Sequence, residues 1–176
     1  MNPTSGSTQE TAMTDTARHT VFGSLDSYTR GEIEITSGSA KHYAFSNIFD
    51  IASKSAPYEK VVAGKNLEYV IEVLRTEGES PWFACAHDEF AIQMDGEVRI
   101  EFIKLHSPPT TGRGTVSAGI QPAGREMGYV VLRKGHQALL PAGCAYRFIA
   151  SKPGVALVQT VLGELSVEKW AEICVH

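Results

Sequence analysis

Short segments in which apolar and polar residues alternate recur along most of this chain. A period of two predicts β-strands that bury one face. The alternation is clear at residues 32–35 and in the longer, β-branched stretch 67–76. Further strands are predicted at residues 90–94, 98–102, 128–133, 137–140, 146–150 and 155–161. Many short strands separated by Gly/Pro turns are typical of an all-β sandwich or barrel.

Two connections between these strands carry specific signals. Asp95 and Gly96 separate the strands predicted at 90–94 and 98–102, and both residue types tolerate a positive φ angle. We therefore predict that these two strands pair as a hairpin with a type I′ turn. Residues 106–128 are rich in Gly and Pro, and they predict a loop whose length favours a functional or docked role.

The two ends of the strand-rich region are less regular. Residues 167–173 predict one short C-terminal helix with Ser166 as its N-cap. Trp170 on this helix is expected to pack the helix onto the sheet. Residues 43–62 mix aromatic and turn-forming residues and support no assignment.

The glycines and proline near the C-terminal strands have a recognisable spacing. Gly135, Pro141 and Gly143 match the second motif of cupin barrels, G-x5-P-x-G-x2-H-x3-N. Tyr146 stands where that motif has a metal-binding His, and Ala150 stands where it has Asn. The pattern therefore keeps the residues that shape turns and lacks a ligand.

An upstream segment matches the first cupin motif in the same incomplete way. Glu89 and Gly96 have the E-x6-G spacing, whereas Phe83 and Cys85 occupy the two positions of the usual His pair. Together the motifs predict a cupin double-stranded β-helix, a jelly-roll barrel, with an extended N-terminal arm and a short C-terminal helix. Of the four usual metal ligands only Glu89 is retained.

Length and composition agree with one compact domain. The chain has 176 residues, enough for one well-buried core. Residues 1–20 are polar and are expected to be flexible, residues 21–35 to form an arm that contacts a partner, and residues 36–176 to form a single cupin domain.

Charge and cysteine content exclude several classes of function. A net charge of −4 without a Lys/Arg run argues against a nucleic-acid partner. No apolar run is long enough to cross a membrane, and the N-terminus lacks the order of a secretory signal. Three widely spaced cysteines indicate neither a disulfide framework nor a zinc motif, so we expect a reducing cytoplasm.

The alternative to a barrel that has lost its metal site is one in which this chain still binds a metal ion. His87 and Glu89 lie two residues apart, so on a regular strand they share a face with Phe83 and Cys85. A third ligand would have to come from elsewhere, and the candidates are His42, His106 and His136. The structural interpretation of His87 is a hydrogen-bonded residue near the barrel mouth. The apolar neighbourhood of Cys85 is typical of an inert thiol.

Trp82 is the candidate substrate-binding residue. It follows Pro81 and leads into the strand that has lost its ligands. An indole offers a rigid surface for a flat phenolic ring, although Trp82 could equally fill a core or an interface. Tyr146 is expected to fill the space that a metal ion would use.

Three stretches carry a resemblance to a known family, namely YAFSNIFDIASKSAPYEKVVAGKN, SPWFACAHDEFAIQMDGEVRIEF and KGHQALLPAGCAYRFIA. They resemble the small (α) subunit of two-component (type II) hydroquinone 1,2-dioxygenase, and the resemblance extends from Val21 to the C-terminus. It implies an α2β2 heterotetramer in which a larger cupin subunit binds Fe(II) and this chain binds no metal.

The same resemblance implies the reaction, the opening of hydroquinone to 4-hydroxymuconic semialdehyde with O2. Hydroquinone-type phenols and O2 would be the substrates, this chain alone would be inactive, and Trp82 would be lent to the shared substrate pocket. Two alternatives remain open from the residues themselves. One is an autonomous metal-dependent cupin enzyme using His87 and Glu89, and the other is a metal-free cupin that binds a small molecule.

Overall fold

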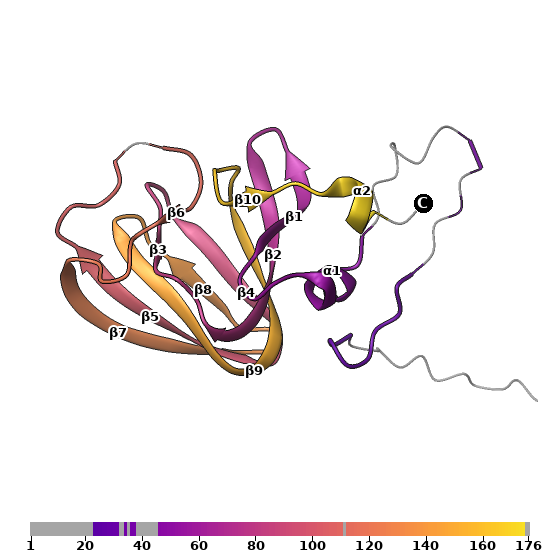
Figure 1. Cartoon of the computed structure of the whole chain (residues 1–176), viewed down its shortest axis with the longest axis horizontal. Coiled ribbons are helices and arrows are strands. Elements are labelled where there is room, and N and C mark those ends of the chain that lie inside the picture. The colour runs from indigo at the N-terminus through magenta and orange to yellow at the C-terminus, as the bar shows by residue number, and fades with distance from the viewer. Residues whose placement is uncertain (1–22, 32–33, 35, 38–45, 111, 175–176) are drawn as a thin grey trace, which may run out of the picture.

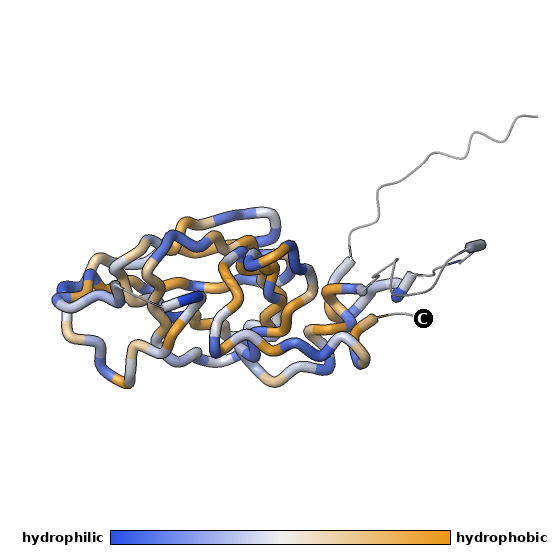
Figure 2. Tube along the Cα trace, turned by 90° about the horizontal axis from the view of Figure 1, so that it is seen from above, coloured by the Kyte–Doolittle hydropathy of each residue, from blue (hydrophilic) through white to orange (hydrophobic). Residues whose placement is uncertain are grey.

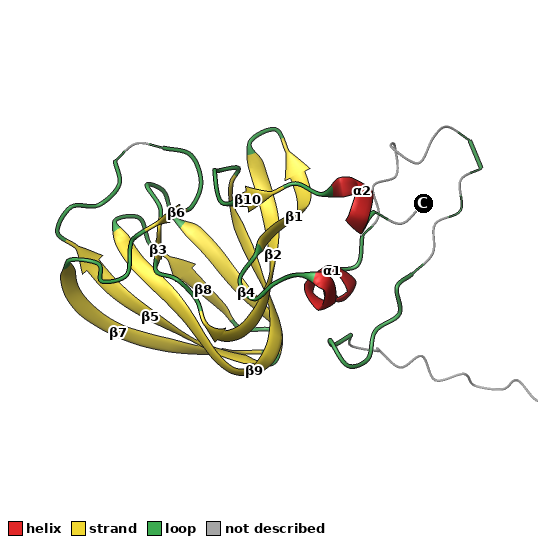
Figure 3. Cartoon of the chain, in the orientation of Figure 1, coloured by secondary structure: helices red, strands yellow, loops and turns green. Residues whose placement is uncertain are grey.

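The chain folds into a strongly curled β-sheet that closes into a half-barrel, with two short helices at one end (Figures 1 and 3). The computed structural model describes residues 23–31, 34, 36–37, 46–110 and 112–174. The elements in chain order are α1 Ile48–Lys54, β1 Lys60–Asn66, β2 Tyr69–Glu79, β3 Phe83–Ala84, β4 Glu89–Asp95, β5 Glu97–Leu105, β6 Val116–Ser117, β7 Gly124–Arg133, β8 Gln137–Leu140, β9 Cys144–Val161, β10 Ser166–Val167 and α2 Trp170–Ile173. The prediction of an all-β barrel with a short C-terminal helix is confirmed.

The long strand β9 joins the two halves of the barrel. Its first part, residues 144–149, pairs with β5, and its second part, residues 155–159, pairs with β4. One half therefore runs β10-β1-β2-β9-β4-β8, and the other runs β6-β3-β9-β5-β7. The two strands predicted at 146–150 and 155–161 are one strand. Pro153 lies between the two paired parts, where a missing N–H costs no ladder bond.

Two clusters of apolar side chains hold this arrangement together. The inner one fills the barrel and includes Leu74, Phe83, Ile100, Tyr146 and Phe148. The outer one lies between the sheet and the two helices, and it includes Ile51, Val61, Val73 and Ile173. In Figure 2 hydrophobic and hydrophilic stretches alternate along the strands, as expected for strands with one face on a core.

The turn at Asp95 and Gly96 is not the predicted hairpin. The strands on either side of it do not pair with each other, because β4 pairs with β8 and β9 whereas β5 pairs with β7 and β9. Gly96 has a φ of 72°, but Asp95 is not among the described residues with positive φ, so the turn is not type I′. The chain instead passes here from one half of the barrel to the other.

Other boundaries also differ from the predictions. Ser166 does not cap the C-terminal helix, because it forms β10 with Val167, parallel to β1, and its hydroxyl donates to Glu72. The helix α2 begins only at Trp170, which packs on the outer cluster as predicted. Part of the loop predicted at 106–128 is strand, since β6 pairs with β3 and β7 begins at Gly124.

The unassigned segment contains the helix α1. The side chain of Asn47 accepts hydrogen bonds from the backbone N–H groups of Phe49 and Asp50, which is the usual way to start a helix. The strand predicted at 32–35 falls mostly on residues outside the described part, as does His42. The predicted strands at 67–76, 90–94, 98–102, 128–133 and 137–140 are confirmed with small shifts of their ends.

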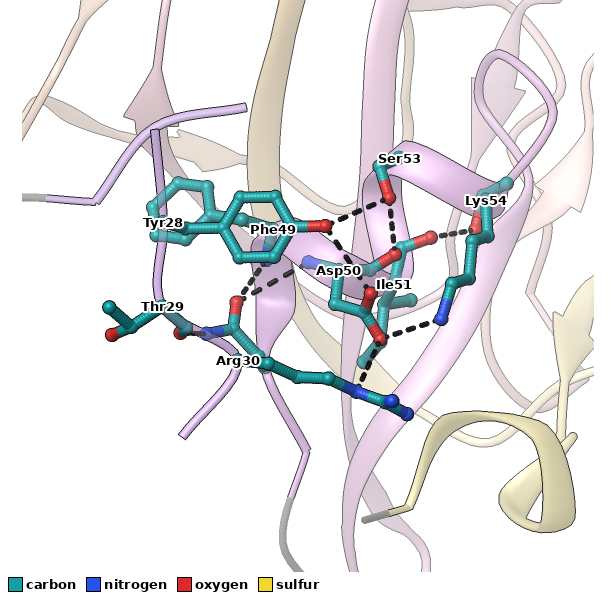
Figure 4. A network of polar contacts seen from close by, with 10 residues as sticks. Tyr28, Thr29, Arg30, Phe49, Asp50, Ile51, Ser53 and Lys54 are labelled. Atoms are coloured by element: carbon teal, nitrogen blue, oxygen red, sulfur yellow. Dashed lines mark hydrogen bonds and ion pairs between the residues drawn. The ribbon is translucent and has the colours of Figure 1, made fainter. Parts of the chain in front are cut away.

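Residues 23–31 lie against α1 rather than adding a strand to the sheet (Figure 4). The phenol of Tyr28 donates to Asp50 over 3.3 Å, and the ring of Tyr28 stacks on Phe49 with 6.2 Å between centroids. Arg30 forms an ion pair with the same carboxylate, 3.5 Å from Nε to Oδ2. The first part of the predicted arm that the structure describes therefore has partners within its own chain.

Candidate functional site

Three potential ligand side chains from the segment that matches the first cupin motif meet inside the barrel. Phe83 lies in the short strand β3, the chain then bends through residues 85–88, and Glu89 begins β4. One ligand atom each from Cys85, His87 and Glu89 lies within 4.8 Å of the other two. The bend, rather than one regular strand, brings these side chains together.

Both carboxylate oxygens of Glu89 are already bound by the chain itself. The Thr115 hydroxyl donates to Oε1 over 2.6 Å, and the Tyr146 phenol donates to Oε2. Glu89 and Tyr146 are completely buried. Burial and the neighbouring Glu89 carboxylate raise the pKa of Tyr146 well above its usual value, so the phenol keeps the proton that it donates. Tyr146, at the position of the missing His, therefore occupies one carboxylate oxygen of Glu89, the one usual ligand that the motif retains.

The thiol of Cys85 also has hydrogen-bond partners within the chain. It donates to the carbonyl oxygen of Gly114 over 3.1 Å, and its sulfur lies 3.1 Å from Nδ1 of His87. Nε2 of His87 lies 3.1 Å from the hydroxyl of Thr160. Burial, with a smaller contribution from Glu89, raises the pKa of Cys85 to about 11, so the thiol stays neutral at ordinary pH. A metal ligand would have to be the thiolate.

These residues do not fit a ferrous centre. Non-haem Fe(II) takes His and carboxylate ligands and keeps open positions for substrate. Here the carboxylate of Glu89 has two hydroxyl partners, and His87 is the one histidine in the described part of the barrel interior. His106 and His136 are exposed, so neither supplies the third ligand considered from the sequence.

A buried ion pair lies on the same inner side of the barrel. Nζ of Lys60 is 3.0 Å from Oε2 of Glu72, and both side chains are almost completely buried. The hydroxyl of Ser166 donates to the other oxygen of Glu72 over 2.6 Å. Nζ of Lys60 also lies 5.0 Å from the centre of the Phe83 ring. Phe83 occupies the position of a metal-binding His in the cupin motif, and its ring contacts the ammonium group of Lys60.

Trp82 faces the opposite side of the sheet. Phe83 and Tyr146 are neighbours across β3 and β9 and point into the barrel, so the adjacent Trp82 and Arg147 point outward. The Arg147 guanidinium carbon lies 4.8 Å from the centre of the Trp82 ring. Both residues line a surface pocket of approximately 350 Å³ together with Glu101 and Tyr129. The structure therefore separates Trp82 from the inner cluster.

Sequence reasoning missed several members of these groups. Thr115 lies in the segment predicted as a loop, and nothing in its neighbours marks it as a partner of Glu89. Lys60 lies in the unassigned segment, although a buried lysine is exceptional. Arg147 follows Tyr146 directly, so strand alternation from the second motif could have placed it beside Trp82 on the outer face.

The comparisons with known proteins find near-complete matches among solved structures. A chain of hydroquinone 1,2-dioxygenase PnpCD, solved with Cd²⁺ and 4-hydroxybenzonitrile, is 64% identical, with a TM-score of 0.89 over 92% of this chain and 99% of that one. A chain of hydroquinone 1,2-dioxygenase from Sphingomonas sp. TTNP3, solved with 4-hydroxybenzoate, is 47% identical, with a TM-score of 0.87 over 90% and 98%. No protein-family profile and no curated sequence matches the chain.

A second kind of chain in the same enzymes shares the fold at low identity. In the Sphingomonas sp. TTNP3 enzyme solved with 4-nitrophenol, a chain is 16% identical with a TM-score of 0.59. The alignment covers 74% of the present chain but 36% of that one, so that chain is much longer.

Proposed function

Because the chain belongs to the hydroquinone 1,2-dioxygenase family, we propose that it is the small, non-metal-binding subunit of a heteromeric, Fe(II)-dependent ring-cleaving dioxygenase. The enzyme opens hydroquinone to 4-hydroxymuconic semialdehyde with O2. The near-complete match to one chain and the partial match to a longer chain in such enzymes support two kinds of subunit. The partner is the longer cupin subunit, and the assembly is an α2β2 heterotetramer.

The iron belongs to the partner subunit in this proposal. The observation that carries it is the state of Glu89, whose two carboxylate oxygens accept hydrogen bonds from Thr115 and Tyr146. Binding a metal ion here would remove both hydroxyl donors and would require Cys85 to lose its proton. Breaking bonds to a buried carboxylate is costly, because each is worth about 1.5–3 kcal/mol.

This chain contributes walls and support rather than reacting groups. Iron in the partner would supply the activation of O2 beside the phenol. Trp82 would lie in a substrate pocket shared between the subunits, with its indole against the aromatic ring. Its position on the outer face of the barrel supports this, because a residue that points away from its own core is free to meet a partner.

The location that fits this enzyme is the cytoplasm. The thiols of Cys85, Cys144 and Cys174 are free, which agrees with a reducing compartment. Among the described residues no helix is long and apolar enough to span a membrane.

One observation favours a second function, an autonomous metal-dependent cupin enzyme. Cys85, His87 and Glu89 lie close enough together to hold one metal ion if Glu89 exchanges its hydroxyl partners. In that case the isolated chain would bind metal and turn over substrate without a partner.

Metal content and oxygen uptake distinguish the two functions. The chain is produced alone and together with the longer subunit, loaded anaerobically with Fe(II), and analysed for bound iron. We expect no iron and no hydroquinone-dependent O2 uptake for the chain alone, and iron with activity for the complex. Stoichiometric iron and O2 uptake by the isolated chain would instead establish the autonomous enzyme.

A further inference from the structure

Arg147 lies over the face of the Trp82 indole. The guanidinium carbon is 4.8 Å from the centre of the ring, within the range of a cation–π interaction. The register of β3 and β9 accounts for the contact, since Phe83 pairs with Tyr146, and Trp82 directly precedes Phe83 whereas Arg147 directly follows Tyr146. The register therefore places the two side chains next to each other on the outer face.

Two carboxylates from different strands hold this guanidinium in place. Nε of Arg147 donates to Glu101 over 2.8 Å, and Nη1 lies 3.2 Å from a carboxylate oxygen of Glu79. Glu101 is the register partner of Arg147 across β5 and β9. The Arg147 side chain is 29% exposed and that of Glu101 is 20% exposed, so this part of the arrangement is only partly in contact with water. A planar group bound along its edge leaves a flat face for the ring.

We propose that Arg147 is a positioning residue, which fixes one face of the Trp82 indole so that the other face meets the aromatic ring of the substrate. The inference rests on the proposed function, in which Trp82 lines the shared pocket. Trp82 immediately precedes the two-residue strand β3 and follows Pro81, so strand pairing alone restrains its rotamer weakly. Arg147, held by Glu79 and Glu101, supplies the missing restraint.

Kinetics of the assembled enzyme test the inference. Arg147→Met removes the cation and both ion pairs, and we expect KM for hydroquinone to rise about three- to tenfold while kcat changes less. Arg147→Lys keeps the charge but lacks the planar, forked guanidinium that stacks on the indole, so an intermediate KM is expected. In a Trp82→Ala background, Arg147→Met should add almost nothing, because residues that act through one another are not additive.

A second measurement follows the indole without turnover. The chain has two tryptophans, so in the chain produced alone Trp170→Phe leaves Trp82 as the sole tryptophan. In that background Arg147→Met should increase quenching of Trp82 by acrylamide, because a freer indole is more accessible. Unchanged quenching would mean that Arg147 does not restrain the ring.

Arg75→Met is the matched control. The Arg75 side chain is 27% exposed and pairs with Glu77 over 2.7 Å, so it resembles Arg147 in exposure and in pairing with a carboxylate. Of these two arginines, Arg147 is the one whose guanidinium lies over the Trp82 ring in the described part of the chain. We expect its KM to equal that of the unmodified enzyme, with assembly checked by size-exclusion chromatography.

If Trp82→Ala leaves KM and kcat unchanged, the proposed pocket role of Trp82 fails. If Trp82→Ala raises KM but Arg147→Met does not, or if Arg147→Met acts equally without Trp82, only the positioning role fails.

Discussion

At the level of single residues, the contacts of Glu89 explain how the barrel interior accommodates a buried carboxylate. A buried charge is costly unless hydrogen bonds satisfy it. Thr115 and Tyr146 each donate one, so side chains of the chain itself satisfy both carboxylate oxygens of Glu89. Tyr146 thus packs in the barrel core and also donates a hydrogen bond to the retained motif residue.

Tyr146→Phe tests this role directly. The substitution keeps the ring but removes the phenol that donates to Glu89, so we expect a loss of about 1.5–3 kcal/mol in the free energy of unfolding. Urea denaturation followed by circular dichroism measures it. Tyr69→Phe is the control, because the Tyr69 side chain is 62% exposed and its loss of a hydroxyl should be neutral. Equal midpoints for the two variants would contradict the role.

Cys85 should behave as an unreactive thiol. Its pKa is raised to about 11, so at pH 8 only about 0.1% is thiolate, the form that reacts with disulfide reagents. In a Cys144→Ser/Cys174→Ser background, we expect the labelling rate of Cys85 to rise about tenfold per pH unit up to pH 9.5. An ordinary thiol would level off in this range. A plateau below pH 9.5 would show that Cys85 is a thiolate at moderate pH and would revive it as a metal ligand.

The sequence identified residues of the site where a fixed spacing marks them. Motif spacing located Phe83, Cys85 and Tyr146, and the structure places all three on the inner side of the barrel. It could not locate Thr115, because its contact with Glu89 spans 26 positions and depends on how a loop closes over the barrel. Pairings across strands are visible only once the strand register is known.

At the level of elements, the strand predictions succeeded because alternation is a local property. The pairing of strands is not local, and this is why the Asp95–Gly96 hairpin was wrong. A short turn with glycine connects two strands equally well within one sheet or between two halves of a barrel. The close approach of Gly96 to Gly154 makes the second arrangement possible, since a Cβ on Gly96 would lie 3.1 Å from the Gly154 Cα atom.

Gly96→Ala should therefore be more destabilising than its φ angle alone requires. Gly135 has a similar positive φ, 84° against 72°, but no atom lies within 4 Å of the place its Cβ would take. A left-handed conformation costs about 1–2 kcal/mol for a residue with a Cβ. We expect Gly135→Ala to lose about this amount and Gly96→Ala to lose about 1–3 kcal/mol more, the usual cost of an extra methyl group in a packed site, measured by thermal and urea unfolding. Equal losses would mean that the crossing tolerates a methyl group.

At the level of the whole molecule, the sheet separates three environments. In the barrel interior the buried polar side chains of the site form hydrogen bonds with one another. One outer region is covered by α1, α2 and residues 23–31. The region around Trp82 and Arg147 remains as a pocket on the opposite half of the barrel. A rigid interior of this kind holds the surface residues around the pocket in fixed positions, as the proposed role beside a partner's active site requires.

The N-terminal segment provides a further test at this scale, through its part in assembly with the longer subunit. We predict that residues 21–35 form an arm that contacts the longer subunit and that residues 1–20 are not needed. In the described part of the arm, Leu25 packs on the outer cluster, and its N–H donates to Asp95 over 3.0 Å. These contacts with its own chain would restrain the base of the arm and lower the cost of ordering the rest, about 1–2 kcal/mol per residue.

Two deletions separate the arm from the polar residues that precede it. Removal of residues 1–20 should leave assembly and activity unchanged. Removal of residues 1–35 should leave a folded barrel by circular dichroism, because the described members of the inner cluster all lie at or after Tyr58, but should weaken association with the longer subunit and lower activity in parallel. Titration of the labelled longer subunit measures the affinity. If the chain lacking residues 1–35 assembles with full affinity, residues 21–35 are not an arm that binds the partner, and the contacts of residues 23–31 with α1 serve their own chain alone.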